Sequence, residues 1–307
     1  MSQTSVNMAN SQSEAVHEDG PRLGDFVVLL KPRVMSLVVF TGFAGLYLAP
    51  GHMHPVLAAI AILCIAIGAG ASGAINMWYD RDIDAHMSRT MNRPLPKHRM
   101  DPATALGFGV VLSVGSVAIM GLAVNYVAAA LLALTICFYV FIYTIWLKRR
   151  TPQNIVIGGA SGAFPPMIGW AAVTGDVSLA SLSLFAIIFM WTPPHFWALS
   201  LYRCGDYAKA GVPMMPVVAG DKETRRLIML YTVLLVPVTL SPYFLGFVGA
   251  LYGISAALLG MVFLWQAWRV NVDHNDASAR RMFGFSILYL FLLFVIMIVD
   301  ATLMVGG

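Results

Sequence analysis

Residues 76–99 read NMWYDRDIDAHMSRTMNRPLPKHR, and the organisation of the whole chain can be worked out from them. The segment begins at the end of an apolar run, and Asn76, Asp80 and Asp84 are spaced four residues apart. On an α-helix, a step of four residues turns ~400° and rises ~6 Å, so these side chains form one stripe on one face. Carboxylates one turn apart repel each other unless a cation lies between them. The spacing therefore predicts a cation site, and such hard oxygen ligands suit Mg²⁺ shared with a diphosphate.

The remaining acid of the segment, Asp82, points to the opposite side of such a helix. We expect it to be a solvated partner of Arg81 or Arg89. A simpler interpretation is that all of these acids are the hydrophilic residues of a loop that flanks a membrane. An ordinary loop has no reason to place acids at helical spacing directly against an apolar run, which favours the cation site.

The composition shows what surrounds this segment. The chain is 59% hydrophobic and 11% charged, whereas soluble domains carry about 25% charged residues. Its mean hydropathy is +0.76, which indicates an integral membrane protein. The net charge of +4 is therefore no signal for nucleic acid, and we expect no nucleic-acid partner. The three cysteines are scattered and predict neither a disulfide framework nor a cysteine metal site.

The apolar residues fall into runs close to the ~20 residues that cross a bilayer. Nine such runs are predicted, at 26–49, 55–75, 102–123, 126–147, 153–174, 179–201, 227–248, 250–268 and 282–304. Residues 1–24 are polar, resemble neither a signal peptide nor a transit peptide, and are predicted to be a disordered tail. Residues 25–307 then form one all-α domain of nine transmembrane helices.

The basic residues give the orientation of these spans. All 19 Lys and Arg fall in the tail, at the start of the first run or in alternate connections, and the other connections carry none. The positive-inside rule then places the N-terminus in the cytoplasm and the C-terminus outside. Two cytoplasmic connections, 76–101 and 202–226, are much longer than the rest, which indicates a functional site at the cytoplasmic face.

Further candidate residues lie in the second long connection or before it. Tyr202 and Asp206 are four residues apart at the end of an apolar helix, and Lys209 follows one turn later. His195 lies seven residues before Tyr202, so it is ~10 Å deeper on the same face. An imidazole inside a span is usually functional, although an interhelical hydrogen bond is the simpler interpretation. Asn154 opens the fifth span near the same membrane face, where its amide could meet a diphosphate or a metal.

Glycines punctuate the fifth span at positions 158, 159, 162 and 169. Their spacing allows neighbouring helices to approach closely. Tight packing alone explains them, and we expect no catalytic role.

The motif N-x-x-x-D-x-x-x-D at the end of a second span resembles the intramembrane prenyltransferases of the UbiA superfamily. More specific motifs of this chain resemble the haem-farnesylating members of that superfamily. These motifs are Lys31-Pro32-Arg33, Arg89-Thr90 with Asn92-Arg93-Pro94-Leu95, Thr192-Pro193-Pro194-His195-Phe196-Trp197, Asp206-Tyr207, and Ala210-Gly211-Val212-Pro213-Met214 with Pro216-Val217-Val218. The resemblance covers about residues 20–304. It implies a UbiA-type bundle of nine helices in a bacterial inner membrane. The implied reaction joins the farnesyl group of farnesyl diphosphate to a vinyl group of haem B and gives haem O for a terminal oxidase.

The resemblance also assigns roles to the candidate residues. Asp80 and Asp84 would hold Mg²⁺ from one side and Asp206 a second Mg²⁺ from the other, with His195 contacting the haem through its iron or its propionates or acting as a base. The expected substrate-binding residues are Asn76, Arg33, Arg89, Arg93, Lys148, Asn154, Tyr202 and Lys209. For any single base, a topology signal or a contact with lipid headgroups is the simpler interpretation. The implied partners are farnesyl diphosphate, haem B, membrane lipid, and haem A synthase or oxidase assembly factors.

One residue departs from the wider superfamily pattern, which often has two acids four residues apart in the second long connection. Here Tyr202 occupies the first of these positions, as it does in haem-farnesylating members. The departure leaves the second metal with one firm carboxylate, Asp206, and puts two-metal catalysis in doubt. Tyr202 is instead a candidate to hydrogen-bond the diphosphate.

Three other functions stay open on the sequence alone. One is prenylation of an aromatic quinone precursor, which uses the same chemistry on another acceptor. A transporter also buries acids among helices, but it is expected to hold them near the middle of the membrane. The third is an assembly factor for a haem-containing oxidase with no catalysis of its own.

Overall fold

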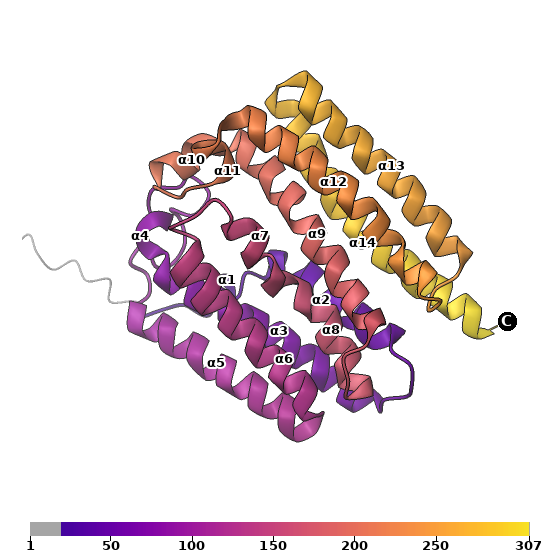
Figure 1. Cartoon of the computed structure of the whole chain (residues 1–307). Coiled ribbons are helices and arrows are strands. Elements are labelled where there is room, and N and C mark those ends of the chain that lie inside the picture. The colour runs from indigo at the N-terminus through magenta and orange to yellow at the C-terminus, as the bar shows by residue number, and fades with distance from the viewer. Residues whose placement is uncertain (1–19, 307) are drawn as a thin grey trace, which may run out of the picture.

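The computed structural model describes residues 20–306, and every regular element within that range is a helix (Figure 1). Among residues 20–306, eight helices are long and apolar enough to cross a membrane, and a bent pair of helices gives a ninth if it is counted as one span. The predicted all-α, multi-pass membrane fold is therefore confirmed. The expected disordered tail, 1–24, lies outside the described residues as far as residue 19, and the first helix begins at Leu23.

The spans follow the predicted apolar runs closely. In chain order they are the bent pair α1 (Leu23–Leu29) and α2 (Pro32–Leu48), α3 (Pro55–Tyr79), α5 (Pro102–Ala123), α6 (Tyr126–Cys137) continued by the π-helix η1 (Phe138–Leu147), α7 (Asn154–Gly158) continued by α8 (Ala160–Thr174), α9 (Leu179–Tyr202), α12 (Gly220–Phe244), α13 (Ala250–Asp273) and α14 (Asp276–Gly306). The two long connections hold the short helices α4 (Arg81–Asp84), α10 (Cys204–Lys209) and α11 (Met215–Val218).

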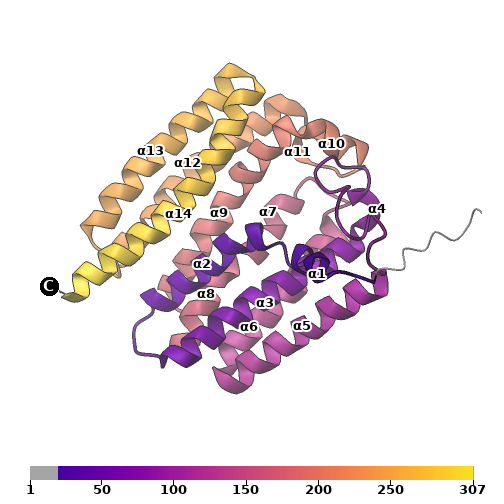
Figure 2. The same ribbon diagram turned by 180° about the vertical axis from the view of Figure 1, so that it is seen from behind.

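The bundle has two sides that meet along its middle. Helix α3 packs on α5 on one side, α12 packs on α13 on the other, and α2, α8 and α9 lie between them (Figures 1 and 2). The connections that carry α4 and α10 lie at the same end of the bundle in both views. The fold thus brings together, at one membrane boundary, two segments that are more than 100 residues apart in the chain.

The first span is bent because its middle residues cannot continue a helix. Lys31 has a φ of 52°, in the left-handed region, and Pro32 is the first residue of α2. Proline is well suited to that position, since its missing N–H would be unpaired there in any case. The axes of α1 and α2 differ by 54° as a result, and the Lys31 side chain is turned toward α3, where it meets Asn76.

The fourth span widens into a π-helix before it reaches the membrane boundary. Its last turn is closed by a hydrogen bond from Lys148 N–H to the carbonyl of Tyr143, five residues earlier. Wide turns of this kind are rare and occur frequently at functional sites. Here the wide turn delivers the side chains of Thr144 and Lys148 to α3.

Glycines permit a very close approach between α2 and α8. A Cβ atom built on Gly169 would overlap the carbonyl oxygen of Gly42 and lie 2.8 Å from the backbone nitrogen of Leu46. The Cβ position of Gly162 on the same helix has no neighbour within 4 Å. The expected role of small residues in helix packing therefore holds for Gly169 and not for Gly162.

This difference gives a matched pair of stability predictions. Gly169→Ala should destabilise the fold by about 1–3 kcal/mol, because the added methyl group forces α2 and α8 apart. Gly162→Ala should leave stability unchanged or raise it slightly, since alanine is the better helix former. Thermal unfolding of the two variants in one detergent measures both, and equal midpoints for the two variants would contradict the prediction.

Candidate active site

The predicted stripe of Asn76, Asp80 and Asp84 is present, although a break divides its helix. α3 ends at Tyr79, yet the backbone N–H of Asp80 still bonds the carbonyl of Asn76 at 2.9 Å, and that of Asp84 bonds Asp80 at 2.8 Å. The side chains therefore keep helical register across the break. All three residues are buried, and Asp80 is 0% exposed. Two carboxylates held in such a place require cations beside them.

Each carboxylate of the stripe has its own cation. The Lys148 ammonium donates to Asp80 Oδ2, and the Arg93 guanidinium donates to Asp84 Oδ2 at 2.6 Å. Lys31 Nζ donates to Asn76 Oδ1 at 2.7 Å, and Asn76 Nδ2 in turn donates to Asp80 Oδ2 at 2.7 Å. Lys148 and Arg93 thus pair with the acids of the stripe, and their binding of a phosphate stays a prediction.

The third acid of the segment has a different partner from the one expected. Asp82 accepts two hydrogen bonds of 2.7 Å from Arg149, so the expected pairing with Arg81 or Arg89 is wrong. This bidentate contact holds the pKa of the Asp82 carboxyl below its usual value. Sequence proximity favoured Arg81 and Arg89, but the fold brings Arg149 from the far end of η1, where it also lies 3.5 Å from Asp80.

The second long connection meets the first through a polar contact. Asp206, on α10, accepts a hydrogen bond of 2.8 Å from Ser88 and lies 3.7 Å from Arg203. Under this contact the two connections share a small apolar cluster with α7 and α9, whose members are Ile83, Met87, Ile155, Tyr207, Val212, Met214, Phe196 and Ala210. The acids of both connections are therefore held at one end of the bundle.

The donor set fits a magnesium ion that takes its remaining ligands from a diphosphate. Among residues 20–306, no three acidic, histidine or cysteine side chains converge to hold a metal unaided. Mg²⁺ seldom needs such a cage, because it keeps several waters and binds through one or two carboxylates plus substrate phosphates. The Oδ1 atoms of Asp84 and Asp206 have no hydrogen-bond partner in the described part of the chain. Asp80, Asp84 and Asp206 as metal ligands stay a prediction.

Asn154 carries an unusual polar atom. The residue is fully buried at the start of α7, and its Nδ2 donates to the carbonyl of Thr151 at 2.6 Å. Its Oδ1 is buried with no hydrogen-bond partner within the described range. Buried oxygens of this kind are rare and require a water, an ion or a ligand. The predicted contact of this amide with a diphosphate or a metal would give Oδ1 the partner that it lacks among the described residues.

Three of the predicted phosphate ligands lie at the surface. Arg33, Arg89 and Lys209 are exposed, and none forms a salt bridge with another described residue. Arg33 is in the first turn of α2, Arg89 follows α4, and Lys209 ends α10. The structure leaves them at the same end of the bundle as the stripe but does not join them to it. Their roles stay predictions.

His195 and Tyr202 lie on one face of α9, as expected, and that face meets α14. The ring of Phe283 stacks on His195 at 4.7 Å between centroids and meets the ring of Tyr202 edge-on at 6.2 Å. On its other side His195 stacks on Trp191 at 4.2 Å. Neither residue contacts Asp80 or Asp84 through any described bond. The two form a second part of the candidate site, separate from the carboxylates.

The hydrogen bonds of His195 fix one nitrogen of its ring. Nδ1 lies 2.6 Å from the hydroxyl oxygen of Ser286, and that hydroxyl donates its single proton to the carbonyl of Phe283 at 2.7 Å. With the hydroxyl proton given to Phe283, Nδ1 carries the proton of the neutral ring, and the lone pair lies on Nε2. Nε2 has no partner among the described residues, so it is free to bind an iron or accept a proton.

Several residues of the site were not singled out from the sequence. Lys31 carries one signal in the sequence, its place before a proline in a resembled motif. Thr144, which accepts a hydrogen bond of 3.2 Å from Asn76 Nδ2, carries no signal because it lies in an unbroken apolar run. Ser88 and Ser286 likewise gain their roles from contacts that cross about 90 to 120 residues of chain.

The chain is similar in sequence to a known protein family and to individual relatives over most of its length. Residues 38–296 match the UbiA prenyltransferase family. The protoheme IX farnesyltransferase of Parvibaculum lavamentivorans is 61% identical over 313 residues, which cover 100% of this chain and 98% of the relative. That of Acidiphilium cryptum is also 61% identical, over 92% of each chain.

Solved structures show the same architecture at low sequence identity. A digeranylgeranylglyceryl phosphate synthase superposes with a TM-score of 0.76 at 19% identity, over 91% of this chain and 98% of that one. A UbiA homolog from Archaeoglobus fulgidus bound to DMAPP and Mg²⁺ gives 0.66 at 15% identity, over 88% and 99%. These two likenesses show the fold.

Proposed function

The chain belongs to the UbiA prenyltransferase family, and from that membership we propose that it transfers the farnesyl group of farnesyl diphosphate to haem B to form haem O. The bond between C1 of the farnesyl chain and the diphosphate oxygen breaks, and C1 bonds one carbon of a haem vinyl group. A water oxygen bonds the other vinyl carbon and releases a proton. The full-length similarity to protoheme IX farnesyltransferases supports this choice of acceptor.

One observation carries the donor half of the reaction: two buried carboxylates, each with its own cation, lie at the end of an apolar bundle. Asp80 and Asp84 would hold a magnesium ion together with the diphosphate, and Asp206 would approach from the second connection. Lys148, Arg93 and Lys31 would then bind phosphate oxygens in exchange for their present partners. When bound, Mg²⁺ neutralises the charge that develops on the leaving diphosphate.

The surrounding helices serve the other requirement of this chemistry, the exclusion of water. An allylic cation is delocalised and forms readily, but water captures it unless the site is dry. The stripe is buried, and apolar side chains of α3, α6 and α8 pack behind it. The hydrocarbon chain of the substrate can lie between such helices or extend into the bilayer.

The position of the acids argues against a transporter. Asp80 follows the last residue of α3, at the end of a span of 25 residues, and not in its middle. A transporter site is expected near the middle of the membrane. Prenylation of a quinone precursor and a non-catalytic assembly role are instead separated by experiment.

Purified protein should be incubated with haem B, farnesyl diphosphate and Mg²⁺, and the product identified by mass. Geranylgeranyl diphosphate in place of the donor, a hydroxybenzoate in place of haem, and a chelator in place of Mg²⁺ run in parallel. We expect farnesylated haem in the first reaction and none with the chelator. Product from the hydroxybenzoate alone would favour the quinone precursor, and no product in any reaction would favour an assembly role.

We also propose that the protein lies in a bacterial inner membrane with its N-terminus in the cytoplasm and its C-terminus outside. The segregation of basic residues supports this orientation. Haem A synthase or oxidase assembly factors are the partners that would receive or deliver haem on this proposal.

Reporter fusions test that orientation directly. Reporters placed after Asn125 and Asp176 should give an outside signal, because these turns lack basic residues. Those placed after Arg99 and Arg150 should give an inside signal. One inverted reporter would mean that the list of spans is wrong at that position.

A further inference from the structure

Tyr202, the last residue of α9, has a guanidinium group over its ring. The Arg280 guanidinium, from α14, lies 4.7 Å from the ring centroid, and that of the neighbouring Arg203 lies at 5.9 Å. We propose that Arg280, held in place by Tyr202, binds the carboxylates of the haem substrate. This inference rests on the proposed function, and it names the group that recognises the acceptor.

The charge of Arg280 is available to a ligand. No carboxylate of the described residues lies within 4 Å of it, whereas Arg93 and Lys148 are each bonded to an acid of the stripe. Arg203 is already close to Asp206, at 3.7 Å. Arg280 is therefore a cation at the membrane boundary whose counter-charge must come from outside the described chain. A planar guanidinium suits a carboxylate, because it can donate two parallel hydrogen bonds.

The rings behind Arg280 suit the rest of a porphyrin. From Tyr202 the contact passes to Phe283 and then to His195, which is stacked between Phe283 and Trp191. This row of aromatic side chains lies between α9 and α14 and leads from the charged boundary toward the apolar interior. Haem B has the same polarity, since its two carboxylates lie on one edge of a flat, largely apolar ring.

Tyrosine is a suitable residue at position 202 for this purpose. Its ring holds the guanidinium by a cation–π contact and does not neutralise it. A carboxylate at the same position would pair with Arg280 and would repel the haem acids. A tyrosine in place of an acid at position 202 is therefore expected if the connection 202–226 binds the carboxylates of haem B as well as a diphosphate.

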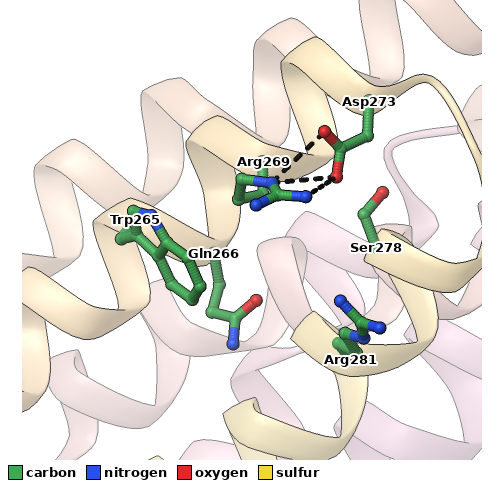
Figure 3. Close-up of a pocket in the computed structure, with 6 residues that line it drawn as sticks. All are labelled: Trp265, Gln266, Arg269, Asp273, Ser278 and Arg281. Atoms are coloured by element: carbon green, nitrogen blue, oxygen red, sulfur yellow. Dashed lines mark hydrogen bonds and ion pairs between the residues drawn. The ribbon is translucent and has the colours of Figure 1, made fainter.

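The next residue along α14 supplies a matched control. Arg281 is also exposed and also lacks an acidic partner among residues 20–306, but it lines a pocket that includes neither Arg280 nor Tyr202. That pocket, of about 40 Å³, lies between α13 and α14 and is bounded by Trp265, Gln266, Arg269, Asp273 and Ser278 (Figure 3). Arg280→Gln and Arg281→Gln remove the same charge from the same helix on two different faces.

The test compares haem B with its dimethyl ester, in which both carboxylates are capped. We expect Arg280→Gln to raise the KM for haem B about 5-fold, a loss of about 1 kcal/mol that fits a partly exposed ion pair. The KM for farnesyl diphosphate should not change. With the dimethyl ester, Arg280→Gln and wild type should have equal KM values. Arg280→Lys should recover part of the affinity, and Arg281→Gln should behave as wild type throughout.

Each outcome decides one statement. If wild type does not farnesylate haem B at all, the proposed function fails. If wild type is active and Arg280→Gln matches it with haem B, the assignment of Arg280 is overturned. An equal loss with haem B and with the dimethyl ester would also overturn it, because the effect would then be structural.

Discussion

Asp80→Asn and Asp84→Asn are expected to lower farnesyl transfer at least ~100-fold while the protein still inserts and folds. Each substitution removes one of two anionic groups that would hold Mg²⁺ and the diphosphate, so the leaving charge is no longer neutralised. Asp80→Asn also leaves the Lys148 ammonium without its carboxylate partner. The measurement is the rate of product formation at saturating Mg²⁺, with membrane insertion checked in parallel. Activity above about a hundredth of wild type would contradict the prediction.

Asp82→Asn is the matched control for this pair. Asp82 lies between the two acids in sequence, but its side chain is 60% exposed and its partner is Arg149. The substitution removes the same charge from the same short segment and leaves the acids of the stripe and their Lys148 and Arg93 partners in place. We expect a change of less than ~3-fold, as for a surface ion pair. A loss as large as that of Asp80→Asn would mean that the segment responds to total charge and has no specific site.

His195→Ala is expected to lower haem binding, or transfer to haem, by at least ~10-fold, which is ~1.4 kcal/mol. The carboxylate stripe and its cations account for a diphosphate, and none of their described bonds involves an imidazole. A haem, in contrast, can bind an imidazole through its iron or its carboxylates. The free Nε2 of His195, fixed by the bond between Nδ1 and Ser286, is suited to that contact.

Two titrations decide the prediction for His195. Haem binding and farnesyl diphosphate binding are measured for wild type and for the variant, and we expect only the first to weaken. If the variant loses diphosphate binding and keeps haem binding, His195 belongs to the donor site and the placement of the porphyrin along α9 and α14 is wrong.

The sequence predicted the features that depend on regular periodicity. Hydropathy located the spans, because a bilayer requires about 20 apolar residues for each crossing. The interval of four residues placed Asn76, Asp80 and Asp84 on one face, and the interval of seven placed His195 and Tyr202 on another. Both intervals survive in the structure because local backbone hydrogen bonds maintain them.

The features that the sequence did not predict depend on departures from regular helix or on distant contacts. The left-handed backbone at Lys31 turns a residue that would otherwise snorkel to the interface toward Asn76. Asp82 finds Arg149 and Asp206 finds Ser88 because the fold brings their segments together. No local pattern encodes the choice between Arg81, Arg89 and Arg149, since all three carry the same charge and differ only in where the backbone places them.

The π-helix at the end of the fourth span has a consequence for which changes the chain can tolerate. A wide turn holds one residue more than the α-helical turn it replaces, so every residue after it is rotated relative to a regular helix. If Phe138–Leu147 closed as an α-helix with all of its residues kept, Lys148 would swing by ~100° about the axis, away from Asp80. Deleting one residue from the segment would offset that rotation and leave the lysine close to its present direction. A gap of one residue in this span is therefore a change that a relative can carry with this lysine still against the acid, provided that its span closes as a regular α-helix.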